Sequence, residues 1–244
     1  MKVTDFNYNL PEKYIAQYPP KVRGTTNLLV IDRNTEKFIH SKYNELDKYL
    51  NKGDCIVLNN TKVIPARLYA FGKDKNKRVE IFLLKNINPD DNIWEVMIGG
   101  ASKIKNDQFL LLEDNKTLVE IIQNEPQKVR MIKFPKEAEE IIEKFGHTPL
   151  PPYIKRPDKS EDVIRYQTIF AEKSGAVAAP TASLNFTDEL INKLKNKGVR
   201  IVYVTLHVGW DTFAPVNEEN VEEHEIHSEW FSIGEQETEI INEV

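Results

Sequence analysis

Between Lys62 and Phe134 the chain carries a succession of short strand-like stretches, with no long helical pattern among them. The stretches are residues 63–71, 78–84, 94–98, 108–112, 118–122 and 129–134. Turn-forming groups such as residues 73–76 and 88–91 separate them at the spacing of hairpins. Short strands that follow one another so closely are typical of a small antiparallel β-barrel.

The sequence on either side of this region alternates between helix and strand patterns. We expect helices over residues 43–50, 135–144 and 188–196, and strands over 28–32, 54–58 and 200–206. The strand at 28–32 should be buried. Thr187 should cap the helix expected at 188–196. The predicted fold class is therefore α/β: an αβα-type domain formed by both chain ends (residues 1–63 and 149–244) with a small antiparallel β-barrel inserted at residues 64–148.

Composition excludes several classes of protein. The single cysteine, Cys55, rules out an internal disulfide and any zinc ribbon or iron–sulfur cluster built from several thiolates. Because apolar residues 56–58 follow it, we expect a buried thiol in a strand. No apolar run is long enough to span a bilayer, and the first residues do not resemble a signal peptide. We therefore expect a soluble, cytoplasmic protein.

Charge is distributed unevenly along the chain. The formal net charge is -5, yet the stretch after Asn217 contains many glutamates and no Lys or Arg, so the rest is mildly basic. Basic residues flank a proline-rich loop together with two aromatic residues that could stack on bases: Lys155, Arg156, Lys159 and Arg165, with Tyr153 and Tyr166. This pattern is compatible with a phosphate-bearing partner, and an ordinary solvated surface beside an acidic tail is the alternative.

His207 directly follows the expected strand at 200–206. In an α/β sheet it would lie at the carboxyl end of a strand, where such folds bind their ligands. Gly209 would allow the backbone to turn there or to approach a ligand closely. The alternative is a histidine that only hydrogen-bonds within the fold.

Two further stretches carry polar groups at strand or helix ends. Asn59, Asn60, Thr61 and Lys62 leave a buried strand and precede Arg67; they could hydrogen-bond a polar ligand or simply form a turn. Residues 175–182 are mostly small and include Thr181. Small side chains allow close packing, so this stretch could face a nucleoside or let a helix pack tightly on the sheet. Neither stretch contains a nucleotide-binding fingerprint.

Histidines near the carboxyl end raise the question of a metal. His224, His227 and Glu229, with His207, include zinc-type ligands, and a zinc-dependent hydrolase is one hypothesis. No defined metal signature such as His-Glu-x-x-His is present, so we predict no metal site.

Several longer sequence motifs are distributed along nearly the whole chain. They are residues 3–6 (VTDF), 59–68 (NNTKVIPARL), 146–154 (GHTPLPPYI), 166–168 (YQT), 175–182 (GAVAAPTA), 205–209 (TLHVG) and 224–229 (HEIHSE). Together they resemble the S-adenosylmethionine:tRNA ribosyltransferase-isomerase family of queuosine biosynthesis. The resemblance implies the same α/β domain with an inserted barrel that the strand pattern predicts.

The resemblance also implies a reaction and its partners. The ribosyl part of S-adenosylmethionine, the co-substrate, would be transferred and isomerised onto 7-aminomethyl-7-deazaguanine in the tRNA anticodon, giving epoxyqueuosine without a metal. That chemistry needs a base, an acid and a pocket for the extruded base. The implied proton-transfer residues are His207, His147 and Asp5, and the implied binding residues are Arg67, Lys103, Tyr153, Arg156 and Gln167. A monomer is expected.

This chain departs from the family pattern at several places. The family has Gly-Leu-His-Phe where this chain has residues 183–186 with Asn185, and Ala-Gly where it has Trp210 and Asp211. The chain also stops at Val244, so we expect the second α/β part to be truncated relative to the family. We expect Asn185 and Trp210 to limit turnover, because asparagine cannot shuttle a proton. The alternative function is a diverged short homologue that binds a nucleoside or RNA without this activity.

Overall fold

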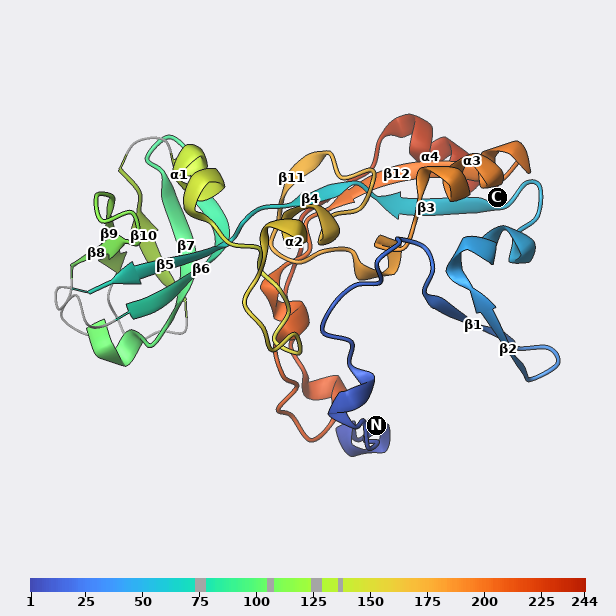
Figure 1. Cartoon of the computed structure of the whole chain (residues 1–244), viewed down its shortest axis with the longest axis horizontal. Coiled ribbons are helices and arrows are strands. Elements are labelled where there is room, and N and C mark those ends of the chain that lie inside the picture. The colour runs from blue at the N-terminus through green and yellow to red at the C-terminus, as the bar shows by residue number, and fades with distance from the viewer. Residues whose placement is uncertain (73–77, 105–107, 124–128, 136–137) are drawn as a thin grey trace. The chain divides into compact units, whose positions relative to one another are not determined.

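The computed structural model describes residues 1–72, 78–104, 108–123, 129–135 and 138–244 (Figure 1). The chain divides into two compact units. Unit 1 comprises Met1–Lys62, Pro151–Pro157 and Ile164–Val244, and unit 2 comprises Val63–Leu150 and Asp158–Val163. Among these described ranges, no helix is long and apolar enough to cross a membrane.

Unit 2 contains a closed β-barrel with the strand order β10-β7-β6-β5-β8-β9. Its strands are β5 (Arg67–Phe71), β6 (Arg78–Asn88), β7 (Ile93–Gly99), β8 (Phe109–Leu112), β9 (Leu118–Gln123) and β10 (Arg130–Lys133). All neighbouring strands pair antiparallel. The predicted α/β class with an antiparallel barrel is thus confirmed.

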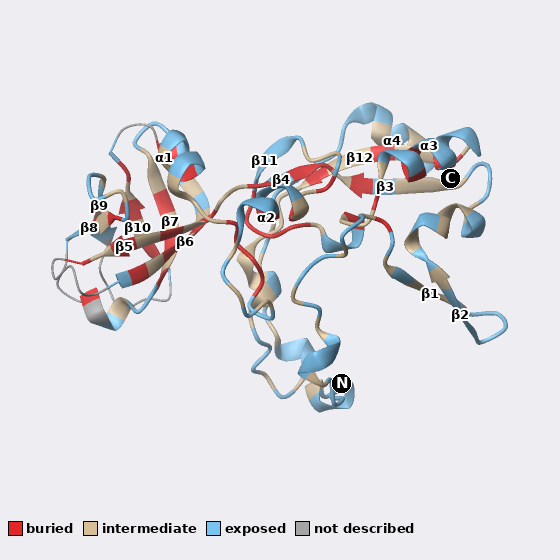
Figure 2. Ribbon diagram, in the orientation of Figure 1, coloured by how far each residue is buried: buried red, intermediate tan, exposed pale blue. Residues whose placement is uncertain are grey.

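The barrel strands alternate buried and less buried side chains, as expected when one face of each strand fills the interior of a small closed barrel. Along β7, for example, every second residue from Trp94 to Ile98 is buried, and Figure 2 shows the same on neighbouring strands. Helix α1 (Ala138–Phe145) adds Ala138 and Ile142 to this buried set. Gly146 ends the helix where only glycine fits, since a Cβ there would lie 2.2 Å from the Pro65 carbonyl oxygen.

Unit 1 is built around a sheet with the order β13-β12-β3. Strands β3 (Cys55–Asn59) and β12 (Arg200–Leu206) run parallel, and β13 (Phe231–Ser232) pairs antiparallel with β12. Helix α3 (Asp188–Asn196) contributes Leu190 and Leu194 to a buried cluster with Leu58. As predicted, the Thr187 side chain caps this helix by accepting from the Leu190 N–H at 3.2 Å.

Two expectations about burial in unit 1 were wrong. The strand predicted at 28–32 forms, as β1 (Asn27–Asp32), but it pairs with β2 (Lys37–Lys42) in a separate hairpin. Its Leu29 and Ile31 are exposed because they lie on the face of a two-stranded sheet rather than inside a layered core. The helix predicted at residues 43–50 forms as a 3₁₀-helix, η3 (Tyr43–Tyr49). The thiol of Cys55 is only half-buried.

The barrel also begins later than residue 63. Residues Thr61–Val63 form β4, which pairs with β11 (Lys173–Ala176) in a two-stranded sheet of its own. Pro65 follows, and its missing N–H is consistent with the interruption before β5. The helix expected from residue 135 begins at Ala138 in α1, residues 136–137 lying outside the described ranges.

Short helices and the carboxyl-terminal segment complete the described chain. They are η1 (Val3–Phe6), η2 (Glu12–Tyr14), η4 (Ala101–Ile104), α2 (Ser160–Arg165), η5 (Thr181–Ser183), η6 (Trp210–Phe213), η7 (Val221–Glu223) and α4 (Glu235–Asn242). The acidic stretch meets the amino terminus, where the Met1 ammonium lies 2.7 Å from Glu222. Helix α4 lies along β12, and Arg200 pairs with Glu243 at 2.8 Å.

Candidate functional site

His207 lies at the carboxyl end of β12 and is held there by two other segments of unit 1. Its backbone N–H donates to the Trp230 carbonyl oxygen at 3.0 Å, and its ring stacks on the Trp230 indole at 4.9 Å between centroids. The Gly175 backbone comes so close that a Cβ added there would lie 2.7 Å from His207 Nε2. The imidazole therefore has little freedom to rotate away from this position.

The Nδ1 edge of the same ring is fixed by Thr61 in β4. His207 Nδ1 and the Thr61 hydroxyl oxygen are 2.7 Å apart and share a hydrogen bond. Partial burial lowers the pKa of His207 below its ordinary value, because desolvation disfavours the imidazolium. The ring is therefore neutral at physiological pH, which is the form that can accept a proton.

The two asparagines after β3 bind the end of β12. Asn59 donates from Nδ2 to the Leu206 carbonyl at 2.8 Å and accepts from the Leu206 N–H at 3.0 Å. Asn60 accepts from the Thr205 hydroxyl at 2.7 Å and donates to Glu172 at 3.2 Å. These bonds hold the strand residues just before His207, while Lys62, two residues after Asn60, is exposed.

Acidic groups surround the turn after His207. The Gly209 N–H donates to Glu229 Oε1 at 2.6 Å, and the same oxygen lies 3.1 Å from His227 Nε2. On its other nitrogen, His227 is 3.8 Å from Asp211. His224 pairs instead with Glu218 at 2.9 Å. Across the described residues no cluster of His, Cys, Asp and Glu has an arrangement suited to a metal ion.

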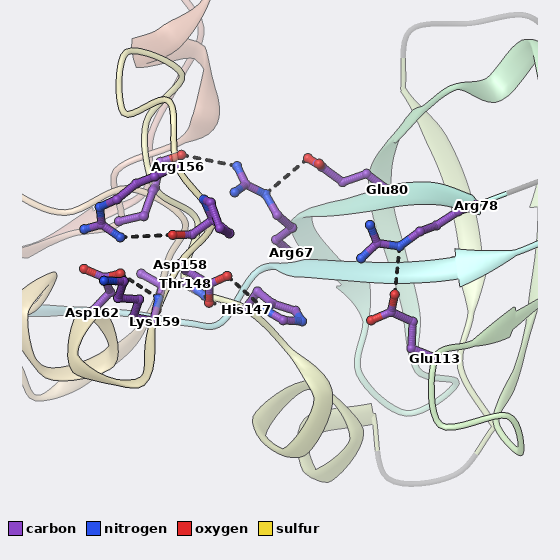
Figure 3. Close-up of polar contacts among 12 residues, drawn as sticks. Arg67, Arg78, Glu80, Glu113, His147, Thr148, Arg156, Asp158, Lys159 and Asp162 are labelled. Atoms are coloured by element: carbon purple, nitrogen blue, oxygen red, sulfur yellow. Dashed lines mark hydrogen bonds and ion pairs between the residues drawn. The ribbon is translucent and has the colours of Figure 1, made fainter. Parts of the chain in front are cut away.

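A second polar cluster lies in unit 2 around His147 (Figure 3). His147 Nδ1 is 3.0 Å and 3.2 Å from the two carboxylate oxygens of Asp158, and Asp158 also accepts from the Thr148 N–H at 3.1 Å. The backbones of His147 and Arg67 bond to each other, and the Tyr69 ring meets the imidazole edge to face at 5.1 Å. His147 is thus oriented by a carboxylate from a distant loop residue.

Arg67 belongs to this same cluster, and its guanidinium makes two polar contacts. Its Nε lies 3.2 Å from Glu80, and its Nη2 donates to the Leu150 carbonyl at 3.2 Å. Arg78, one strand over, pairs with Glu113 at 2.8 Å and lies over the Tyr69 ring at 3.9 Å. Three further basic residues, Lys73, Lys75 and Lys77, precede Arg78 in the sequence but lie outside the described ranges.

The remaining candidates lie in unit 1, except for Lys103, which belongs to unit 2. The Tyr153 carbonyl accepts from Gln17, Arg156 donates to the Gln17 carbonyl at 2.8 Å, and the Gln167 carbonyl accepts from Arg23 at 2.9 Å. Thr181 opens η5 and is exposed, and Asp5 lies in η1, where it accepts from the Lys2 N–H. Lys103 falls in η4, but its side chain lies outside the described part of the structure.

The two departures from the family pattern have definite positions. Asn185 accepts from the Thr26 hydroxyl at 2.9 Å, so its amide is used to tie the β1 segment to the loop before α3. Trp210 begins η6, directly after Gly209. Sequence reasoning did not point to Trp230 or Asp158, because their roles arise from contacts between segments far apart in the chain. It named Glu229 only as a zinc-type ligand, whereas the structure shows Glu229 accepting from the Gly209 N–H and lying beside His227.

Comparison with known proteins decides the family. The family model described as queuosine biosynthesis protein matches residues 3–244. The chain belongs to this family. It is 44% identical to a protein of Sulfurihydrogenibium sp. over 99% of this chain and 71% of that protein, which is named S-adenosylmethionine:tRNA ribosyltransferase-isomerase. A protein of Acetivibrio thermocellus with the same name is 43% identical over 99% of this chain and 70% of its own length.

A solved structure is also similar in sequence. It is the S-adenosylmethionine tRNA ribosyltransferase from Thermotoga maritima, at 27% identity and a TM-score of 0.40. The match covers 98% of this chain and 64% of that chain. This chain therefore spans somewhat less than two thirds of the solved relative.

Proposed function

We propose that this protein transfers and isomerises the ribosyl part of S-adenosylmethionine onto 7-aminomethyl-7-deazaguanine in tRNA. The products would be epoxyqueuosine in the tRNA, adenine and methionine. The observation that carries the proposal is the family match over residues 3–244, supported by relatives of that name at 43–44% identity. S-adenosylmethionine is the co-substrate, and the reaction as proposed needs no metal.

His207 is assigned as the base of this reaction. The sulfonium of the co-substrate makes neighbouring protons acidic, and a neutral imidazole can remove one of them. Burial keeps His207 neutral, and Trp230 and Thr61 keep its ring in one orientation. A positioned general base of this kind commonly contributes about a hundredfold to ten-thousandfold in rate.

His147 is assigned as the acid that assists adenine departure. With the Asp158 carboxylate accepting at Nδ1, the Nε2 nitrogen is the one through which this ring exchanges a proton with another molecule. Asp158 is then a positioning residue, in the way that carboxylates orient catalytic histidines elsewhere. Asp5, exposed in η1, is the third proton-transfer candidate.

The remaining parts of the proposal concern binding and location. Substrate contacts are assigned to Asn59, Asn60, Thr61, Lys62, Arg67, Lys103, Tyr153, Arg156, Gln167, Thr181 and Gly209. The tRNA would present its anticodon region, the enzyme would act as a monomer, and its compartment would be the cytoplasm. Binding of tRNA does not require a continuous basic surface, because a few well-placed cations can supply the contacts to phosphate groups.

The proposal is tested by incubating the purified chain with S-adenosylmethionine and tRNA that carries the aminomethyl-deazaguanine base. Mass spectrometry should detect adenine and a tRNA base of increased mass. His207→Gln should abolish most of this signal, whereas His40→Gln, a change at an exposed histidine of β2, should leave it intact. Binding of both substrates by folded protein without adenine release would contradict the proposal and support the non-catalytic homologue.

A further inference from the structure

Two segments of unit 1 that are far apart in sequence are joined side by side. Gln17 donates to the Tyr153 carbonyl at 3.1 Å and accepts from the Lys155 N–H at 2.6 Å. Arg156 donates to the Gln17 carbonyl at 2.8 Å, and the Lys155 ammonium pairs with Glu12. Because these bonds involve backbone groups on both sides, the relative position of the two segments is well defined.

Six side chains from these segments form what we call the aromatic–basic face. They are Lys13, Tyr14, Tyr18, Tyr153, Lys155 and Arg156. The tyrosines are 69%, 56% and 45% exposed in chain order. Arg156 lies over the Tyr18 ring at 4.4 Å, and Lys13 lies over the Tyr14 ring at 5.1 Å. Two bonded segments therefore carry three exposed rings and three cations, and two of the cations lie over two of the rings.

The charge of these segments is strongly one-sided. Residues 8–23 and 153–157 also contain Lys21 and Arg23, and their one carboxylate is Glu12. The Glu12 pair with Lys155 is solvent-exposed on both sides, so it holds the lysine only weakly. A phosphate could replace that carboxylate at little cost. The face thus offers a net positive field although the whole chain is acidic.

We infer that the aromatic–basic face binds a single-stranded RNA loop, with bases stacked on the tyrosine rings and phosphates against the cations. The inference rests on the proposed function for the presence of an RNA partner. Single-stranded loops are recognised in this way because their bases are free to leave the helix and stack on aromatic side chains. Duplex RNA keeps its bases stacked internally and cannot use the rings.

The chemistry of the face favours RNA over a protein partner. The centres of protein interfaces are depleted of charged residues, particularly lysine, whereas here Lys13 and Arg156 lie over two of the rings. Burying those ammonium groups against an apolar partner would leave them unpaired. A polyanion with planar bases satisfies both kinds of group together.

The inference is tested by fluorescence anisotropy with a labelled anticodon stem-loop RNA and, separately, a duplex of the same length without a loop. The double variant Tyr14→Ala, Tyr18→Ala should bind the stem-loop about tenfold or more weakly, since each lost stack costs on the order of 1–3 kcal/mol. Its affinity for the duplex should hardly change. Tyr14→Phe, Tyr18→Phe keeps both rings and should bind the stem-loop like the wild type.

Two further variants separate stacking from charge and from general surface effects. Phe38→Ala removes an exposed aromatic ring from the β1–β2 hairpin and should leave stem-loop binding unchanged. Lys13→Ala should reduce the slope of log affinity against log salt concentration by about one, the equivalent of one phosphate contact. Lys195→Ala on α3 should leave that slope unchanged. Near-UV circular dichroism confirms that every variant is folded.

The binding assay does not depend on catalysis, so this inference and the proposed function fail separately. If the wild type releases adenine but the Tyr→Ala variant binds the stem-loop with unchanged affinity, the face is not the RNA site. If the variant loses loop affinity while no protein releases adenine, the inference stands and the proposed reaction is wrong. Equal losses for stem-loop and duplex would also overturn the inference, since they would show a purely electrostatic surface.

Discussion

At the scale of single residues, the orientation of His207 depends on what its neighbours lack as much as on what they contribute. Trp230 supplies a stacking surface and Thr61 a hydrogen bond, but Gly175 contributes by having no side chain. The φ of Gly175 is +149°, a conformation that other residues rarely adopt. Position 175 is therefore constrained both by its backbone and by the ring beside it.

Gly175→Ala is expected to lower both the unfolding free energy and the rate of adenine release. The backbone strain should cost on the order of 1–3 kcal/mol, and the displaced His207 ring should reduce turnover about tenfold or more. Gly53→Ala is the matched control, because Gly53 has a φ of +96° but no atoms within 4 Å of an added Cβ. It should lose stability without losing activity, as thermal melts and initial rates would report. Equal activity of the two variants would contradict the steric role of position 175.

The lowered pKa of His207 predicts how rate and stability depend on pH. The ordinary pKa of histidine is about 6.5, and the imidazole of His207 should remain neutral to a pH below that value. The acidic limb of kcat/KM should therefore have its midpoint below about pH 6.5. The unfolded chain takes up this proton first, so the contribution to stability is present above about pH 6.5 and decreases as pH falls through the folded-state pKa. Urea titrations of wild type and His207→Asn at several pH values check the second effect. An acidic limb centred above pH 6.5 would show that the kinetic group is not His207.

At the scale of elements, the sequence pattern predicted helices and strands correctly where buried positions recur with a single period along the whole segment. The barrel strands and α3 are of this kind, and Thr187 caps α3 as its position before the helix indicated. The β1 segment has the same apolar composition as a buried strand, yet Leu29 and Ile31 are exposed, since burial depends on which elements cover a face. The placement of His207 at a strand end followed from local sequence. Of its two partners, Thr61 belongs to the polar stretch at 59–62 that the sequence already indicated, whereas no local rule brings Trp230 to the same place.

Thr187→Ala should destabilise the protein by about 1 kcal/mol through loss of the α3 cap. The Leu190 N–H would then lack its side-chain acceptor at the start of a helix whose inner face is buried. Thr187→Ser keeps the hydroxyl and should be close to wild type in urea-induced unfolding. Destabilisation of the serine variant by the same amount would indicate that the methyl group, not the cap, matters.

Asp158→Asn should reduce adenine release while leaving the loop around His147 in place. The amide can still accept from the Thr148 N–H, but it can turn its own N–H₂ toward His147 Nδ1 and favour the other tautomer. We expect a loss of about tenfold or more in kcat with little change in KM for S-adenosylmethionine. Asp162→Asn, in the adjoining helix α2, serves as the comparison. A change confined to KM would place Asp158 in substrate binding instead.

At the scale of the whole molecule, the barrel carries its own buried core. Residues from β5 through β10 supply interior side chains such as Leu68, Ile81, Leu83 and Val96, all nearly inaccessible to solvent. Closure of the sheet also removes the open edges that would otherwise favour aggregation. These properties are those of a unit that can fold independently.

A fragment of residues 63–163 is accordingly expected to fold by itself. Its one tryptophan is Trp94, which is buried in the barrel, so the folded fragment should emit at short wavelength and shift cooperatively to the red in urea. The same fragment with Ile81→Asp serves as an unfolded reference, because an unpaired charge in the core is not tolerated. A wild-type fragment whose emission matches this reference in buffer would show that unit 2 needs the rest of the chain.

The parallel pairing of β3 with β12 also sets an order of events during synthesis. Cys55 pairs with Arg200 and Asn59 with Val204, so the ribosome completes every barrel strand before the partner of β3 exists. At about 5–20 residues per second, β3 waits on the order of ten seconds while the barrel emerges and can close. Joining strands so distant in sequence carries an entropy cost that grows with the intervening length, and a folded barrel shortens the chain that remains free. The strand that leads into His207 therefore joins its sheet late, after the barrel segment that separates the two strands in sequence has been synthesised and can close.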